Sequence, residues 1–307
     1  MNGVLVIDKA AGPTSHDVVA SVRRLLKIKK VGHTGTLDPA ATGVLPLVLG
    51  KATKVARFLS SASKSYHAVV RLGITTDTLD AVGEVLEEKE VNVERASVEA
   101  ELEAFRGEIE QIPPMYSAKK IDGKRLYELA RSGIEVERPA KQVTISSLDL
   151  LGFDGLDVEL DVTCSAGTYM RVLAQDLGEA LGCGAHLHAL RRTQAGPFDL
   201  SRSITLDELG DNPERAAELL VPMGDALQGL PSIAVPSDIS RMIANGYQLT
   251  VADLRTLDTP PFETDTTLTL REDSGAVIAI VTSLLPSADL MRSRREQHAF
   301  KTERVVR

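Results

Sequence analysis

The segment VGHTGTLDPAATGVLPLVLGKATK, residues 31–54, decides how the rest of the chain is interpreted. Glycines and small residues surround a single carboxylate, Asp38, which is followed by Pro39. Glycine reaches backbone conformations that other residues adopt only at a cost, and proline fixes its own φ angle. The apolar run 44–49 then predicts a buried anchor. The segment therefore predicts a carboxylate on a tight, rigid loop, as a catalytic acid requires. A structural Asp-Pro turn is the alternative.

The length of the chain and its cysteines limit the class of protein. With 307 residues there is room for one large domain and a smaller one. No apolar run is long enough to cross a bilayer, and the run from Val4 to Ile7 is too short for a signal peptide. Cys164 and Cys183 lie far apart without metal-ligand partners, so we expect both to fill the core in a reducing compartment. These features predict a cytoplasmic protein with no membrane association.

The distribution of charge is more informative than the net charge of −8. Residues 1–71 hold 11 Lys or Arg and 3 acids, a net of +8, whereas residues 72–110 hold 3 basic and 12 acidic residues, a net of −9. Local basic patches contact phosphates, so the acidic total does not exclude an RNA partner. The alternative is that Arg23, Arg24 and the nearby lysines only solvate the end of a helix.

Hydrophobic periodicity predicts strands and helices along the whole chain. A strand at Val4–Ile7 precedes a capping-box pattern, Thr14 to Asp17, that opens a helix. Alternation from Ser65 to Leu72 predicts a strand with Tyr66 on its apolar face. Further strands are predicted at 142–153, 157–164, 267–271 and 277–282, and helices at 52–59, 94–105, 203–227 and 237–245, with another that begins near residue 170.

Two other groups of polar residues could be taken for metal ligands, but neither is interpreted as a metal site. Asp77 and Asp80 have no obvious third ligand nearby, so they are predicted to be solvated acids of a loop. His186 and His188 lack partner acids or cysteines at metal-ligand spacing. We therefore expect no metal at either group, and we expect no cofactor.

The segment 111–141 combines basic and aromatic residues. Pro113 and Pro114 interrupt regular structure, and Tyr116 and Tyr127 lie among the basic residues Lys119, Lys120, Lys124 and Arg125. Basic and aromatic side chains in an exposed loop are typical of contacts to single-stranded or looped RNA. The alternative is a solvated loop and helix.

These motifs together resemble the bacterial tRNA pseudouridine-55 synthases, the TruB family, which isomerise one uridine in the T-loop of tRNA. Residues 32–54 are similar to the signature loop of that family. Lys64-Ser65-Tyr66, the segment 111–141 and Gly167-Thr168-Tyr169-Met170-Arg171 then match further family motifs in the same order. Met170 stands where the family usually has isoleucine, which is a tolerable apolar exchange.

The resemblance implies roles for individual residues. Asp38 matches the essential aspartate of the family, Arg171 the arginine that pairs with it, and Tyr66 the tyrosine that contacts the target base. As RNA-binding residues it implies His33, Lys9, Lys64 and Tyr169, together with Lys119, Lys120, Lys124 and Arg125 of a flexible "thumb" insertion. Whether Asp38 attacks the sugar, attacks the base or removes a ribose proton is left open.

The resemblance also implies an α+β fold. We expect a mixed-sheet catalytic domain at residues 1–229, with the thumb at about 111–141, and a small β-rich, PUA-like RNA-binding domain at 230–307. The expected function is conversion of uridine to pseudouridine in the tRNA T-loop by base flipping, cleavage of the glycosidic bond and reattachment through C5. The expected partner of this monomer is the T-loop and T-stem of tRNA. The alternatives are a non-catalytic tRNA-binding or tRNA-folding protein and a guide-RNA-dependent pseudouridine synthase.

Overall fold

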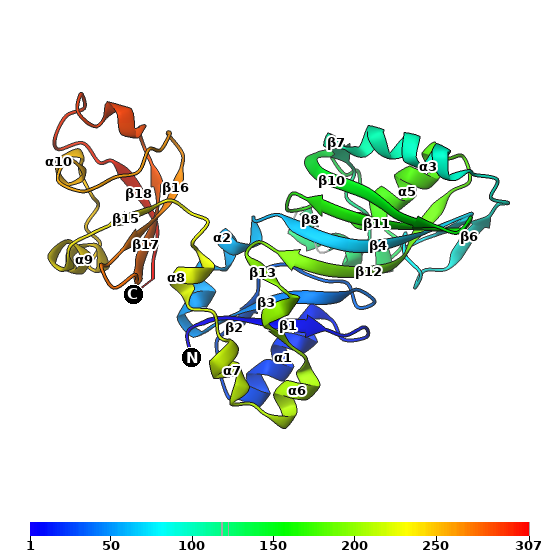
Figure 1. Cartoon of the computed structure of the whole chain (residues 1–307), viewed down its shortest axis with the longest axis horizontal. Coiled ribbons are helices and arrows are strands. Elements are labelled where there is room, and N and C mark those ends of the chain that lie inside the picture. The colour runs from blue at the N-terminus through cyan, green and yellow to red at the C-terminus, as the bar shows by residue number, and fades with distance from the viewer. Residues whose placement is uncertain (118, 122, 307) are drawn as a thin grey trace.

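The computed structural model describes residues 1–117, 119–121 and 123–306. In this part of the chain, ten strands form a large mixed sheet and four form a smaller sheet near the C-terminus. Figure 1 shows the two sheets at opposite ends of an elongated molecule, with α8 (Met223–Ala226) between them. The α+β class and the C-terminal β-sheet domain expected from the sequence are both confirmed.

The large sheet is mixed because two of its strand pairs, β1–β14 and β3–β12, are parallel and the others are antiparallel. Its order is β14 (Ser203–Ile204), β1 (Gly3–Lys9), β3 (Thr42–Leu49), β12 (Ala185–Ala195), β4 (Lys64–Leu72), β11 (Asp157–Cys164), β10 (Lys141–Phe153) and β7 (Gly107–Gln111). The short strands β13 (Phe198–Asp199) and β2 (Val31–His33) pair with β12 and β3. This order brings strands from the beginning, middle and end of the large domain side by side.

Helix α1 (Ser15–Leu26) begins at the predicted capping box. The hydroxyl of Thr14 accepts from the backbone N–H of Asp17, and the Asp17 carboxylate accepts from that of Thr14. Val18 and Val22 are fully buried against β1, β3 and Leu37. The N-terminus of α1 is thereby fixed beside the loop that carries Asp38.

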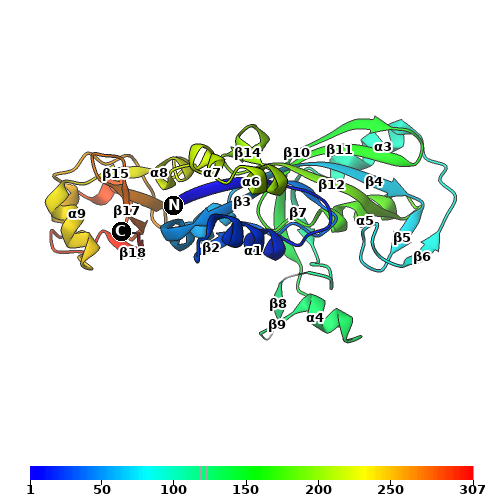
Figure 2. The ribbon, with the colours of Figure 1, turned by 90° about the horizontal axis from the view of Figure 1, so that it is seen from below.

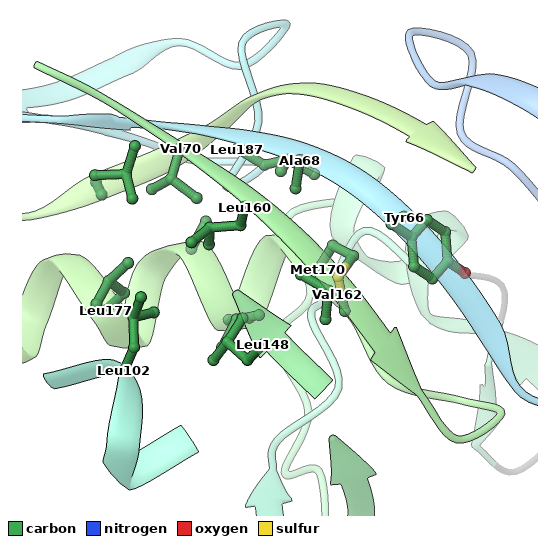
Figure 3. Packing of buried hydrophobic residues seen from close by; sticks show 14 of the residues in the cluster. Tyr66, Ala68, Val70, Leu102, Leu148, Leu160, Val162, Met170, Leu177 and Leu187 are labelled. Carbon is green, nitrogen blue, oxygen red and sulfur yellow. The ribbon is translucent and has the colours of Figure 1, made fainter. Parts of the chain in front are cut away.

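Helix α5 (Met170–Ala180) lies on the face of the sheet that α1 also covers, and it packs there against β4 and β11. Leu173 and Leu177 are buried, and Figure 3 shows α5 residues such as Leu177 beneath the apolar side chains of β4 and β11. Tyr66 lies at one end of this cluster, and its hydroxyl points away from Ala68 in the same view. The alternation of buried and partly exposed residues in β4 therefore places the aromatic ring of Tyr66 at the edge of the core.

Two hairpins extend the large domain. The first, β5 (Ile74–Thr76) with β6 (Val85–Glu88), holds the loop that contains Asp77 and Asp80. The second, β8 (Lys120–Ile121) with β9 (Lys124–Arg125), is followed by α4 (Leu126–Arg131). Figure 2 shows β8, β9 and α4 projecting from the sheet on the side where α1 lies.

The C-terminal sheet consists of β15 (Ser232–Ala234), β16 (Thr267–Arg271), β17 (Val277–Ser283) and β18 (Phe300–Val305). Helices α9 (Ser237–Ala244) and α10 (Val251–Leu254) complete its own apolar core. Val277, Ile280 and Val306 face the other way and share a cluster with residues of β1 and β3. The small sheet is therefore packed onto the large domain. None of the described helices is both long and apolar enough to cross a membrane.

Several predicted helices are shorter than expected. The region 203–227 contains β14 and three short helices, α6 (Leu206–Asp211), α7 (Arg215–Leu219) and α8, because Pro213 and Pro222 lack the N–H that a continuous helix needs. The predicted helix at 52–59 is a 3₁₀ turn (Gly50–Val55) followed by α2 (Ala56–Ser60). The helix predicted at 94–105 divides into α3 (Arg95–Leu102) and a 3₁₀ turn (Glu103–Phe105).

Candidate active site

Asp38 lies in the loop between β2 and β3, and the N-terminus of α1 holds this loop. The hydroxyl of Ser15 donates to the carbonyl of Leu37 at 3.0 Å and accepts from its N–H at 2.9 Å. The N–H of Ala41 donates to the carbonyl of Asp38 at 3.1 Å, which closes a turn. Leu37 is only 3% exposed. The carboxylate is therefore carried by backbone that is fixed on both sides, as the glycine- and proline-rich sequence predicts.

Arg171, in the first turn of α5, lies against Asp38. Its Nη2 is 3.1 Å from Oδ2 of Asp38, and the arginine side chain is 8% exposed. The same guanidinium donates to the carbonyls of Thr78 at 3.1 Å and Tyr116 at 2.7 Å. The Asp38 loop, α5 and the segments with Thr78 and Tyr116 thus meet at the guanidinium of Arg171. These contacts orient the planar guanidinium toward the carboxylate of Asp38.

The surroundings of Asp38 raise the pKa of its carboxyl group. Burial is the largest cause; Arg171 opposes it, and the neighbouring carboxylate of Asp80 adds to it. The side chain nevertheless remains 44% exposed on one side. The carboxylate of Asp38 therefore pairs with Arg171 on one side and is accessible to a substrate on the other.

Asp80 is a member of the site that the sequence did not reveal. Its Oδ2 lies 3.6 Å from Nη1 of Arg171, and its Oδ1 accepts from the hydroxyl of Thr78 and the N–H of Val82. The prediction of a solvated acid is therefore wrong for Asp80, whose side chain is 18% exposed. The loop docks onto β12 through a bridge to Leu187, a long-range contact without a local sequence signal.

Tyr66 lies at the boundary between the core and the site. It is 8% exposed, and burial raises the pKa of its phenol. The charge of Arg192 lowers the pKa of this phenol and that of Asp38 raises it, so both groups act on Tyr66. The hydroxyl group is therefore protonated and directed toward the polar edge of the cluster.

Lys9 and Lys64 are both buried, and both donate to backbone carbonyls. Lys9 donates to Ala10 at 3.0 Å, Pro39 at 2.9 Å and Ala41 at 2.7 Å, so it supports the Asp38 loop from below. Lys64 donates to the carbonyls of residues 60 and 62, and burial lowers the pKa of its amine to about 8. The RNA contacts expected of both lysines stay predictions.

His33 and Tyr169 lie near the same loop. His33 is half-buried, its ring meets that of His16 edge to face at 5.3 Å, and burial lowers the pKa of its imidazole. Tyr169 directly precedes α5, and Gln111 binds both its N–H and its carbonyl. A neutral imidazole and a half-buried phenol suit contacts with bases better than contacts with phosphates.

The thumb residues lie apart from this cluster. Lys119 is half-buried and Lys124 is exposed, and the N–H of Leu126 donates to the carbonyl of Lys119. The side chains of Lys120 and Arg125 lie outside the described part of the structure. The root of the insertion does meet the site, because the carbonyl of Tyr116 accepts from Arg171.

Arg192 is a second residue to which the sequence assigns no role. It is 1% exposed, and its Nε donates to the carbonyl of Val44 at 2.7 Å. It appears in the sequence only as one of two adjacent arginines in β12, so no local pattern separates it from Arg191.

Solved structures with a similar fold establish the class of protein. A crystal structure of a Cbf5-Nop10-Gar1 complex matches with a TM-score of 0.81 and 29% sequence identity, over 99% of this chain and 85% of that chain. A structure of an H/ACA RNP bound to a substrate RNA containing 2'-deoxyuridine matches with a TM-score of 0.78 and 27% identity, over 99% and 85% of the two chains. The fold and the acid–arginine site define a pseudouridine synthase.

Sequence relatives define the family within that class. Residues 23–170 match the family model "TruB family pseudouridylate synthase (N terminal domain)", and residues 171–228 match "tRNA pseudouridylate synthase B C-terminal domain". The tRNA pseudouridine synthase B of Pseudomonas paraeruginosa is 53% identical over 236 residues, which are 75% of this chain and 78% of that protein. The corresponding protein of an Azoarcus species is 49% identical over 250 residues, 81% and 83% of the two chains. The chain belongs to the TruB family of pseudouridylate synthases.

Proposed function

We propose that this protein converts uridine to pseudouridine in tRNA, at position 55 of the T-loop. Relatives about half identical in sequence are tRNA pseudouridine synthases B, which supports tRNA as the substrate. The choice of the T-loop uridine rests on the resemblance of residues 32–54 to the signature loop. The observation that carries the proposal is the partly exposed carboxylate of Asp38, held 3.1 Å from the buried guanidinium of Arg171.

The reaction is a balanced isomerisation. The bond between N1 of uracil and C1' of ribose breaks, the base turns, and a bond forms between C5 and C1'. The proton on C5 leaves and N1 gains one, so no electrons enter or leave. A uracil inside a folded loop cannot reach a carboxylate, so it must first be flipped into the site.

Asp38 acts on the reacting nucleotide, and Arg171 keeps it ionised and oriented. The positive charge of Arg171 opposes the rise in the pKa of Asp38 that burial causes. Tyr66 would offer a flipped uracil an aromatic face, and its phenol would assist removal of the C5 proton. Lys9 serves the reaction by fixing the loop carbonyls on the C-terminal side of Asp38.

We further propose that residues 1–229 form the catalytic domain and residues 230–307 a PUA-like RNA-binding domain. His33 and Tyr169 would contact the flipped nucleotide, Lys64 would lie close to it, and the thumb lysines 119, 120 and 124 with Arg125 would contact tRNA phosphates. The Asp38–Arg171–Asp80 group comes from a single chain, which supports a monomer as the active form. With tRNA as the substrate, the protein would act in the cytoplasm.

The test uses an unmodified tRNA transcript that carries tritium at C5 of its uridines. Pseudouridine formation releases tritium to water, so release without any added RNA or protein supports a stand-alone enzyme. Release that requires a guide RNA would favour the guide-dependent alternative, and binding without release would favour a tRNA-folding protein. Replacing the T-loop uridine by cytidine should abolish the release.

A further inference from the structure

Arg192 lies in the middle of the large sheet, between the strand that carries Tyr66 and the strand that follows the Asp38 loop. In β12 its backbone is in register with Tyr66 of β4 on one side and with Gly43 of β3 on the other. Gly43 has a φ of +97°, and a Cβ there would lie 2.2 Å from the carbonyl oxygen of Arg192. Glycine is therefore required where the end of the loop approaches Arg192.

The side chain of Arg192 reaches both sides of the same loop. Its Nε donates to the carbonyl of Val44, after Asp38, at 2.7 Å. Its Nη2 and Nη1 donate to the carbonyls of Gly35 at 3.1 Å and Thr36 at 3.4 Å, before Asp38. One planar group thus joins the two ends of the loop that presents the carboxylate.

The charge of Arg192 is costly at this position. The residue is 1% exposed, and among the described residues no carboxylate forms an ion pair with it. Backbone carbonyls, those of Gly35, Thr36 and Val44, accept its hydrogen bonds instead. A buried cation without an anion is destabilising unless such contacts compensate it, and proteins retain costly groups of this kind mainly where function requires them.

We propose that Arg192 is a positioning residue for the isomerisation: it fixes the Asp38 loop relative to Tyr66, so that carboxylate and phenol meet the flipped uracil in a set geometry. The inference rests on the proposed function, since it concerns the same reaction. A displacement of about 1 Å in such a site can cost about a hundredfold in rate. Arg192 acts through its neighbours and does not itself contact the nucleotide.

The neighbouring arginine provides a matched control. Arg191 points to the opposite face of β12, where its Nη2 lies 2.7 Å from Oδ2 of Asp8, and its side chain is 40% exposed. We compare Arg192→Met with Arg191→Met by the single-turnover rate of tritium release at saturating tRNA, the Kd for tRNA and the melting temperature. We expect Arg192→Met to be about a hundredfold slower with a Kd within about threefold of the parent. Arg191→Met should keep the parent rate.

The rates are measured well below the melting temperature of each variant, so that a loss of folding is not counted as a loss of rate. A purely structural role would lower the melting temperature and leave the rate of the folded protein unchanged, which would overturn the proposal. If Arg192→Met does not fold, Arg192→Lys is used for the same comparison, because lysine keeps the positive charge but lacks the planar guanidinium that bonds both sides of the loop. A rate about tenfold below the parent supports the proposal, and a rate within about threefold overturns it.

Coupling to Tyr66 is tested with a double-mutant cycle. Arg192 is in register with Tyr66, so if it fixes the loop relative to that residue the effects of Arg192→Lys and Tyr66→Phe should be less than additive, whereas full additivity would contradict this link. The activity of the parent protein distinguishes a failure of the proposed function from a failure of the role proposed for Arg192. A parent that releases no tritium from tRNA contradicts the proposed function itself, whereas an active parent matched by an equally active Arg192→Met contradicts only the role of Arg192.

Discussion

Asp80 and Asp38 share one guanidinium group. Oδ2 of Asp80 lies 3.6 Å from Nη1 of Arg171, and Oδ2 of Asp38 lies 3.1 Å from Nη2 of the same side chain. The two carboxylates also act on each other, since Asp80 raises the pKa of Asp38 while Arg171 lowers it. The ionisation of the candidate catalytic acid therefore depends on a residue from a separate hairpin loop.

Asp80→Asn should move the acid limb of the pH–rate profile to lower pH. The asparagine side chain still offers an oxygen to Thr78 and Val82, so the loop should keep its shape, while Asp38 loses a neighbouring negative charge and its pKa falls. If ionised Asp38 is the active form, activity then persists to lower pH. Single-turnover tritium release across the acid range measures the shift. Asp77→Asn, in the same loop, should leave the limb in place, and a shift to higher pH in Asp80→Asn would contradict the sign.

Arg171→Lys should slow the reaction by about a hundredfold or more, with little effect on tRNA affinity. Lysine keeps the charge but cannot reach Asp38, Asp80 and the carbonyls of Thr78 and Tyr116 together. Single-turnover rates and filter-binding Kd values separate the two effects. A variant with the parent rate would show that the pairing with Asp38 has no part in the reaction.

Changing Lys119, Lys120 and Lys124 together to alanine should weaken tRNA binding and flatten its salt dependence. Removing one lysine from a phosphate reduces the slope of log Kobs against log salt by about 0.7–0.9, so a total change of about 2–3 is expected if all three lysines bind phosphates. The rate at saturating tRNA should fall less than the affinity. Lys89→Ala is a control, since this lysine lies 3.1 Å from Glu87 in the acidic region. An unchanged slope in the triple variant would remove the thumb from the RNA interface.

The interface between the two domains should depend on apolar packing more than on charge. Val306→Ala removes part of a side chain that is 1% exposed in the cluster shared with β1 and β3, and should lower the free energy of unfolding by about 2 kcal/mol. Breaking the exposed pair of Arg57 and Glu303, whose atoms lie 2.6 Å apart, should cost about 0–1 kcal/mol. Urea unfolding of Val306→Ala and Arg57→Ala compares the two. A larger loss in Arg57→Ala would reverse this ranking.

The parts of the fold that local sequence determines were predictable. The capping box at Thr14 and Asp17, the alternation of β4 and the apolar face of α5 all follow from spacing within a few residues. The strand β2, by contrast, has only three residues, and these adopt a strand conformation because they pair with β3. Short elements of this kind depend on partners that a local pattern does not contain.

The site divides in the same way. Asp38 is recognisable because glycine, proline and an apolar anchor surround it in sequence, and the structure brings it to Arg171. Asp80 and Arg192 have no such surroundings, because their partners lie in other strands and loops. A lone acid or arginine is more often a surface residue, and only the packed sheet distinguishes these two from Asp77 and Arg191.

Asp38→Asn tests the central claim most directly. The amide keeps the shape of the side chain and removes the negative charge that faces Arg171. Tritium release from C5-labelled tRNA should fall by several orders of magnitude in single-turnover assays, while the Kd for tRNA stays within about threefold, because the carboxylate acts mainly in the transition state. A variant that releases tritium within about tenfold of the parent rate would contradict the assignment of Asp38 as the catalytic acid.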